Sequence, residues 1–458
     1  MLFVYYNEKL FTNWKMISWE KSRSNLLRLQ KRLFKSVYVG DINKSLKIQK
    51  LIVFSNSARL LAIRAATQTG ITKWVSGIDG KTSLTFLERF NLNQFLLVYA
   101  NNWKPKKPKE ILFSNNDSSC NRNIIFSISD RSWQYLIQFA LEPAHEALFV
   151  PRSYGFRASY LIHNLQRVIY LNLNKSSHGL QKRVLIFDFP KLFNCINYNF
   201  LLDKIIAPRG IKLGIFRFLK IGLSPHFINE EKYVDNFPCL LANIFFNGIE
   251  LLHNSVRYGS KLLIFLNPND NEFLIKNKII KFLDHIGLDN INIKVDLFSA
   301  ALGFDFLDWH FRVYSKGSLF CTPSVQNYRL FLRRVKHIIN NSNYALKLAP
   351  IVKEWKCYHR FCNLKNSRFS LFYVQKRAFK IFNKESKQDR YSSKKLLNKS
   401  FLSFNSNKLD LLNNNFSPYN CHVTFWCDYK IQSTFELQLL YVGFGKKNIC
   451  IHCGMNIS

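Results

Sequence analysis

The stretches RVLIFDF (183–189) and VRYGSKLLIFL (256–266) decide the fold of this chain. The first is an apolar run that closes on an acid, Asp188, and such a run is typical of a buried strand. The second predicts two strands around a tight turn at Gly259-Ser260. LGFDFLDWHFRVY (302–314) alternates apolar and polar residues and predicts one further strand. We therefore expect a β-sheet in the middle of the chain.

Helical periodicity flanks this strand-rich middle. Residues 19–38 form an amphipathic pattern whose cations are expected to face solvent, namely Arg23, Arg28, Lys31 and Arg32. A basic face of this kind either is simply solvated or binds nucleic acid. Further helices are expected at 40–72, 130–149, 158–170, 193–206 and 239–252, with Asp130 as the N-cap of the second of these. Residues 101–123 are polar and basic and contain proline, which predicts a loop or a hairpin.

The net charge narrows the classes of function. The 458 residues carry 66 Lys+Arg against 29 Asp+Glu, a formal charge of +37. This balance excludes an ordinary metabolic enzyme as the default and indicates a polyanionic partner, either nucleic acid or an acidic membrane. We find no uninterrupted apolar run of about 18 residues that could span a bilayer. Nucleic acid is therefore the expected partner, and a membrane is not.

The most basic part of the chain is also helical in pattern. Residues 325–400 contain 19 Lys+Arg and three acids, interleaved with aromatic residues. Cations that contact phosphates and aromatics that stack on bases are the groups that bind RNA. The expected RNA-binding residues here are Arg333, Arg334, Lys336, Lys353, Lys356, Tyr358, Arg360, Lys376, Arg377 and Lys380. For Trp355, a core position between two helices is favoured over a base-stacking role.

Several stretches together, in order along about 340 residues, resemble the reverse transcriptase–maturase proteins encoded by group II introns, in an organellar, plastid-like form. They are LQKRL (29–33), GIDGKTS (77–83), DRSWQ with ALEPAHEALF (130–149), SYGFR (153–157), RVLIFDF, CLLANI (239–244), VRYGSK (256–261), GFDFLDW (303–309), TPS (322–324) and LAPIVKEWKCYHR (348–360). The resemblance implies an α+β right-hand polymerase fold with basic fingers, a palm sheet and a helical thumb that doubles as the maturase domain.

The resemblance also divides the chain. We expect the N-terminal basic helical region and the start of the fingers at 1–100 and a degenerate reverse transcriptase fingers and palm domain at 101–318. The thumb and maturase domain, called domain X in the family, is expected at 319–402, followed by a linker and a small cysteine-containing tail at 403–458.

The resemblance places a polymerase site at the two stretches quoted first, but most of its ligands are missing. Asp188 matches one of the family's metal-binding acids. The other two acids belong to a Tyr-x-Asp-Asp hairpin, whose positions here are Tyr258, Gly259, Ser260 and Lys261. A two-magnesium site needs several carboxylates, and an ammonium group repels the ions. We expect Asp188 to be a vestigial strand-end acid paired with Lys261, and the chain not to be an enzyme.

The C-terminal tail contains Cys421, Cys427, Cys450 and Cys453, whose spacing resembles the start of the HNH nuclease module in the family. Four cysteines could hold a structural zinc ion. Reduced thiols without metal are favoured, because the spacing of the first pair is loose. Five residues follow Cys453, too few for the rest of a nuclease. No cofactor is expected to be required.

The expected function is that of a group II intron maturase, which binds intron RNA and assists its folding and splicing with reverse transcriptase activity lost. The alternatives are an active RNA-directed DNA polymerase of a mobile intron and a non-specific basic scaffold. Host splicing factors or a homodimer are further partners to consider. The plastid is the expected location, with the mitochondrion as the alternative.

Overall fold

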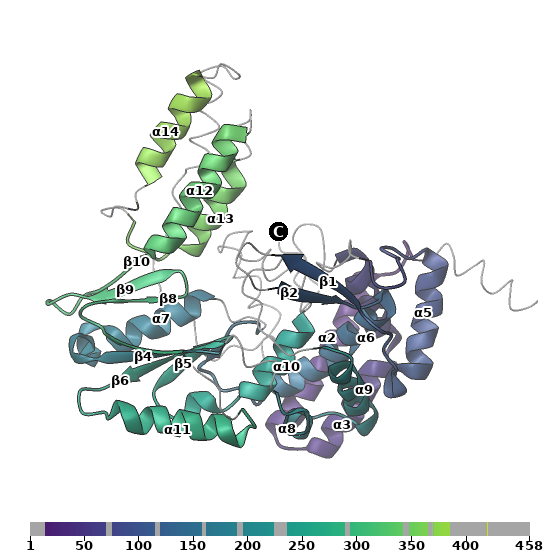
Figure 1. The fold of residues 1–458 in the computed structure, drawn as a ribbon. Helices are drawn as coiled ribbons and strands as arrows, with labels where there is room; N and C mark the ends of the chain where they lie inside the picture. The colour runs from purple at the N-terminus through teal and green to yellow at the C-terminus, as the bar shows by residue number, and fades with distance from the viewer. Residues whose placement is uncertain are drawn as a thin grey trace, which may run out of the picture.

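The structure is a computed structural model that describes residues 14–69, 76–114, 120–157, 162–189, 196–223, 236–288, 294–341, 348–364, 369, 371–384 and 419. Within these ranges, helices combine with mainly antiparallel strands, in agreement with the predicted α+β class. Figure 1 shows the N-terminal helices on one side, the larger sheet on the other, and the last helices standing above that sheet.

The N-terminal part is a helical bundle. Its helices are α2 (Trp19–Tyr38), α3 (Ile42–Phe54), α4 (Asn56–Arg64), α5 (Phe86–Tyr99) and α6 (Ile128–Glu146). Helix α2 begins at Ser18, whose hydroxyl accepts a hydrogen bond from the Lys21 amide, and buries Leu26 and Leu33 at helical spacing. Helix α5 begins with a capping box between Thr85 and Glu88. The helices predicted at 19–38 and 40–72 are thus confirmed, the second as two helices that meet at Ser55.

The start of α6 corrects the predicted N-cap. Ser127 caps this helix, because its hydroxyl accepts a hydrogen bond from the Asp130 amide at 3.3 Å. Asp130 lies in the first turn and is fully buried. Its carboxylate accepts hydrogen bonds from the indole N–H of Trp103 at 2.8 Å and from the Lys106 amide at 3.2 Å. The acid therefore anchors the segment before the helix and does not cap the helix itself.

A five-stranded sheet forms the middle of the described chain, in the order β3-β5-β6-β4-β7. Its strands are β3 (Ser153–Tyr154), β4 (Arg183–Asp188), β5 (Ser255–Tyr258), β6 (Lys261–Leu266) and β7 (Lys294–Ser299). Strand β3 runs parallel to β5 and the other pairs are antiparallel. The strand predicted at 183–189 and the two predicted strands around Gly259-Ser260 are confirmed.

Both faces of this sheet are covered, which explains the continuous apolar runs of its central strands. Leu185 and Phe187 join the core shared with the N-terminal bundle. Val184 and Ile186 join a second core on the opposite face. The helices of this part of the chain are α7 (Ile162–Leu173), α8 (Tyr198–Lys204), α9 (Arg209–Lys220), α10 (Asn236–Phe246) and α11 (Glu272–His285). Helix α7 contacts β5, whereas α9 packs against the N-terminal part at Ala100–Asn102. The helices predicted at 158–170, 193–206 and 239–252 are present with shifted ends.

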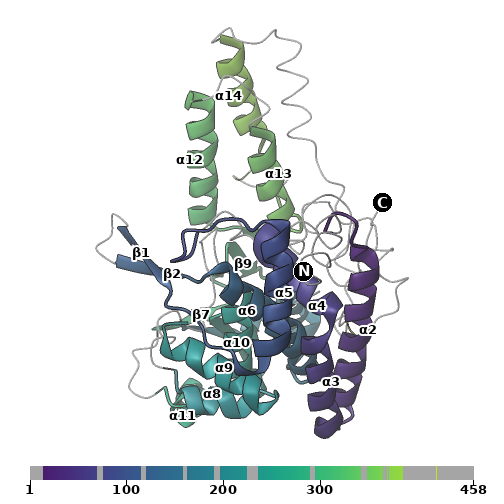
Figure 2. The same cartoon turned by 90° about the vertical axis from the view of Figure 1, so that its right-hand side faces the viewer.

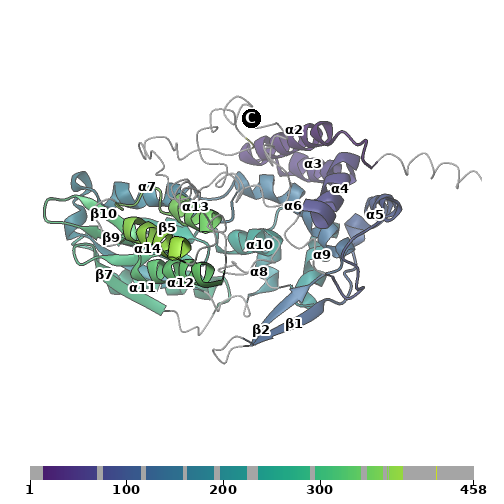
Figure 3. The same ribbon diagram turned by 90° about the horizontal axis from the view of Figure 1, so that it is seen from above.

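Two smaller sheets complete the strands of the described residues. The stretch 302–314, predicted as one strand, forms the two strands β8 (Phe304–Phe306) and β9 (Trp309–Val313), because Leu307 adopts a positive φ of 53° and turns the chain. These strands pair with β10 (Leu319–Pro323) in a three-stranded sheet. Strands β1 (Lys109–Ser114) and β2 (Cys120–Ile125) pair as an antiparallel hairpin, which overlaps the loop or hairpin region predicted at 101–123 and ends two residues beyond it. Figure 3 shows this hairpin projecting from the body of the molecule.

The last described helices are α12 (Val325–Asn341), α13 (Leu348–Tyr358) and α14 (Leu371–Lys384). Figure 2 shows them rising together from the rest of the molecule. They share a core of their own, in which the Trp355 ring stacks on Phe331 at a centroid distance of 4.6 Å. The Trp355 indole N–H also donates to the Asn327 side chain at 2.8 Å. The core position favoured for Trp355 is therefore confirmed. Among the described residues, no helix is both long and apolar enough to cross a membrane.

Candidate nucleic-acid interface

The hairpin of β5 and β6 faces Asp188, as the sequence predicts. Asp188 is paired in register with Lys261 on β6 and with Lys294 on β7, so lysines flank it on both sides in the sheet. The Lys261 ammonium lies 3.7 Å from the Asp188 carboxylate. The backbone N–H of Phe189 donates to the carbonyl of Ser260 at 3.0 Å, which fixes the hairpin turn beside the end of β4. The predicted pairing of Asp188 with Lys261 is confirmed.

These residues do not fit a pair of magnesium ions. Two-metal catalysis needs several hard oxygen ligands around both ions. Ser260 is only 3% exposed and is neutral, and Lys261 brings a positive charge to the one acid of the site. Among the residues that the structure describes, no group of three or more His, Cys, Asp and Glu side chains could hold a metal ion. Asp188 therefore has a cation as its neighbour where the family has further acids.

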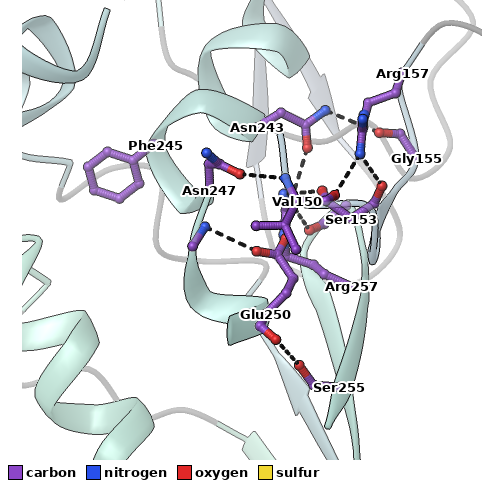
Figure 4. Close-up of polar contacts among 12 residues, drawn as sticks. Val150, Ser153, Gly155, Arg157, Asn243, Phe245, Asn247, Glu250, Ser255 and Arg257 are labelled. Carbon is purple, nitrogen blue, oxygen red and sulfur yellow. Dashed lines mark hydrogen bonds and ion pairs between the residues drawn. The ribbon is translucent and has the colours of Figure 1, made fainter. Parts of the chain in front are cut away.

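A buried charge network lies next to the hairpin turn, and Figure 4 shows the polar contacts among its members Arg257, Asn243 and Ser153. The guanidinium of Arg257, on β5, is fully buried and forms an ion pair with the equally buried Glu250. It also donates to the Asn243 side chain at 3.0 Å and to the Ser153 hydroxyl at 2.6 Å. A further hydrogen bond of 3.0 Å reaches the carbonyl of Gly259 in the turn itself. The turn that carries Ser260 and Lys261 is therefore fixed to α10 and β3.

A second buried pair fixes the neighbouring SYGFR turn. Arg157 forms a bidentate ion pair with Glu146, and both side chains are at most 2% exposed. Burial raises the pKa of Glu146, whereas the Arg157 guanidinium lowers it. Gly155, at a φ of 87°, packs so closely that a Cβ atom there would lie 3.0 Å from the Gly259 amide. The sequence analysis missed Glu146 and Glu250. The signal that could have found them is an acid inside an otherwise apolar stretch.

Helix α2 presents part of the predicted basic face. Arg28 and Arg32 are exposed, and Lys21 and Lys35, which the sequence analysis did not single out, are exposed along the same face. Lys31 is half-buried. The prediction that Arg23 faces solvent is wrong, because this residue is 3% exposed and lies one turn before Leu26 on the packed face. Its side chain therefore belongs to the bundle interior.

The helices α12, α13 and α14 expose most of the predicted cations. The exposed ones are Arg333, Arg334, Lys336, Lys353, Lys376 and Lys380, together with Arg329, which the sequence analysis missed. Helix α12 contains no acid, so the charges on its outer face are all positive. The side chain of Arg377 and the cysteines Cys421, Cys427, Cys450 and Cys453 lie outside the described residues.

Three residues predicted to bind RNA instead lie largely within the protein at the end of α13. Lys356 is 8% exposed, and burial lowers its pKa to about 8. The Tyr358 ring stacks on Trp309 of β9 at a centroid distance of 5.1 Å, and burial raises its pKa well above the ordinary value. Arg360 is half-buried, with its guanidinium 5.2 Å from the Phe361 ring. Tyr358 thus joins α13 to the sheet below, and the expectation that Lys356 is exposed is wrong.

Comparison with known proteins agrees with this arrangement. Residues 14–96, which include α2 to α4 and most of α5, match the family model for the N-terminal domain of reverse transcriptase. The chain is 46% identical over 449 residues to maturase-like protein 1 of Euglena gracilis, a match that covers 95% of this chain and 96% of the relative. It is 45% identical over 452 residues to maturase-like protein 1 of Euglena longa, covering 96% and 97% of the two chains. The chain therefore belongs to the group II intron maturase family.

Proposed function

We propose that the protein binds group II intron RNA through its exposed cations and favours the fold of that RNA in which splicing occurs. The observation that carries this proposal is the outer face of α12, where Arg329, Arg333, Arg334 and Lys336 are exposed on a helix without acids. Phosphate contacts supply most of the affinity of proteins for RNA. Binding one conformer more tightly than the others shifts the RNA towards that conformer.

We further propose that the protein does not polymerise DNA. Lys261 pairs with Asp188 at 3.7 Å, and Ser260 is a neutral neighbour. A single acid next to an ammonium group cannot hold two divalent cations in place. In this proposal the ion pair stabilises the adjoining ends of β4 and β6, and the bond changes of splicing belong to the RNA.

The arrangement of the elements supports a right-hand layout. The basic N-terminal bundle would correspond to the fingers, the five-stranded sheet to the palm, and α12 to α14 to the thumb and maturase domain, with the domain boundaries predicted above. We place the protein in the plastid, with no required cofactor and with reduced thiols in the cysteine tail. Subcellular fractionation and measurement of the zinc content of the purified protein test these two points.

Competition binding tests the main proposal. Labelled intron RNA is bound to the protein and then displaced by unlabelled intron RNA or by transfer RNA. We expect transfer RNA to be the weaker competitor by about tenfold or more, which corresponds to about 1.4 kcal/mol of preference. Equal displacement by both RNAs would contradict the proposal and indicate a non-specific basic scaffold.

A further inference from the structure

Helix α5 carries exposed aromatic side chains on its outer face. Phe95 is 47% exposed, Val98 is 68% exposed and Tyr99 is 49% exposed. The rings of Phe95 and Tyr99 lie 4.5 Å apart, and Phe95 meets the edge of Trp103 at 5.5 Å. Half-exposed rings that contact one another form a continuous apolar surface, which is more than the single exposed apolar residues found on most proteins.

The segment that follows α5 along the chain carries several lysines. Lys104, Lys106, Lys107 and Lys109 are all exposed, on a segment that leads from α5 to β1. Figure 2 shows α5 at the surface, with the chain running on from it to β1. Within the described ranges, none of these four lysines has a carboxylate at ion-pair distance, and Glu110 is the single acid between 100 and 114.

The backbone that carries these lysines is held in place. Trp103 donates to the buried Asp130 and stacks on Trp133 at a centroid distance of 6.2 Å. Asp130 also accepts from the Lys106 amide, and Arg217 donates to the Trp103 carbonyl at 2.9 Å. The lysines therefore extend from a fixed backbone that contacts Phe95 through Trp103. A fixed backbone loses fewer degrees of freedom when a ligand binds.

We propose that Phe95 and Tyr99, together with Lys104, Lys106 and Lys107, form a binding site for an unpaired RNA strand. This site rests on the proposed function and adds to it a second mode of RNA contact. Unpaired bases stack on aromatic rings while the backbone phosphates follow neighbouring cations. A duplex offers phosphates but no free base faces, and α12 matches that case, since its aromatic residues Tyr328 and Phe331 are half-buried or buried beneath exposed cations.

The lysines also favour RNA over a protein as the ligand of this surface. An apolar helix face that binds another protein is desolvated when the partner covers it, and lysines are depleted in the centre of such interfaces. Here Lys104, Lys106 and Lys107 follow Tyr99 by five, seven and eight residues along the chain. An unpaired RNA strand can stack its bases on the rings and place its phosphates next to the lysines.

The test uses the full-length protein and two labelled RNAs, an unstructured oligouridine of about twelve nucleotides and a hairpin duplex. Fluorescence anisotropy gives the affinity for each. The variant Phe95→Leu with Tyr99→Leu keeps apolar bulk but removes the ring faces. We expect it to weaken oligouridine binding by about tenfold or more, with little change for the duplex. The variant Lys104→Gln with Lys107→Gln should weaken oligouridine binding as well and lower its salt dependence.

The matched controls lie on α11. Phe273 is 67% exposed there, and Lys278 and Lys281 are exposed on the same helix. Figure 1 shows α11 below the sheet, away from α5. Phe273→Leu and the pair Lys278→Gln with Lys281→Gln should leave oligouridine binding unchanged. Thermal unfolding of each variant confirms that the fold is intact.

Two outcomes would overturn this proposal. In one, the α5 variants bind oligouridine like the wild type. In the other, they lose self-association in sedimentation while oligouridine binding is unchanged, which would make this face a protein interface. In either case the wild-type protein can still prefer intron RNA to transfer RNA, so the proposed function stands. Loss of that preference in the wild type would instead contradict the proposed function.

Discussion

The buried guanidinium of Arg257 illustrates how single residues shape this molecule. Its pairing with Glu250 is fully removed from solvent, and buried charges depend on one another and on their hydrogen bonds for stabilisation. We expect Arg257→Met to lower the free energy of unfolding by about 3–5 kcal/mol, because Glu250 would be left as a buried charge without its partner. Urea unfolding at neutral pH measures this loss.

Lys81→Met is the control for that substitution. Lys81 pairs with Glu88 at the surface, where solvent screens the interaction. The control should leave the unfolding midpoint close to that of the wild type. A loss for Arg257→Met as small as that of Lys81→Met would show that the buried pair does not stabilise the fold.

His145 gives the protein a defined response to acid. The side chain is 3% exposed, and its Nε2 atom accepts a hydrogen bond from the Ile206 amide at 3.2 Å, so the ring is neutral there. Burial and the nearby Lys212 lower its pKa from 6.5 to about 3. Between these values the unfolded chain binds the proton and the folded chain does not, so stability falls as the pH falls through this window.

We expect His145→Gln to remove part of that dependence. The slope of the unfolding free energy against pH should become shallower by up to about 1.4 kcal/mol per pH unit between pH 6 and 4. Urea unfolding over this range measures it. The control is His178→Asn, since His178 is exposed and adopts a positive φ of 54° that Asn accepts. Equal slopes for the wild type and His145→Gln would contradict the account.

At the scale of elements, helix α12 carries the main RNA-binding prediction. Arg333→Ala with Arg334→Ala should weaken binding to intron RNA and reduce the dependence of log K on log salt by about one to two units, because each phosphate contact releases close to one counterion. Filter binding at several salt concentrations gives both quantities. Lys278→Ala with Lys281→Ala on α11 removes the same charge elsewhere and should change the slope less. Identical slopes for both double variants would exclude α12 from the interface.

The elements predicted correctly from the sequence are those with a clear apolar pattern, either a continuous apolar run or helical spacing. Strands β4 and β6 are covered on both faces and therefore have continuous apolar runs. Strand β7 has Lys294 and Asp296 among partly exposed residues, so it gave no comparable signal. Helices α5, α9 and α11 were not predicted, although α9 has a clear apolar face. The two-residue strand β3 is defined by its partner β5 and has no pattern of its own.

The candidate interface could be predicted only in part for a related reason. Helical spacing shows which residues share a face, but not which face the neighbouring helices cover. Arg28 and Arg32 are exposed as expected, whereas Arg23 is covered by the bundle. Similarly, Lys353 is exposed on α13 and Lys356 is buried. Tertiary packing decides which of these cations are exposed and which are buried. The local sequence pattern does not show how the helices pack.

At the scale of the whole molecule, charge and architecture point to one function. The described residues form three packed cores, and the chain has a formal charge of +37. A polyanion bound to such a chain reduces the repulsion among its positive charges. The exposed cations assigned to RNA binding occur on α2, on the segment after α5 and on α12 to α14, and thus on elements far apart in the sequence. A large folded RNA can contact all of them together, which a small anionic ligand cannot.

The most direct test of the central claim is primer extension on bound intron RNA. A DNA primer is annealed to the intron, and the protein is added with deoxynucleotides and either Mg²⁺ or Mn²⁺. We predict that the wild-type protein binds the primed RNA and leaves the primer unextended with both ions, because Lys261 lies where a metal-binding acid would be needed. Template-dependent extension that Asp188→Ala abolishes would contradict the account.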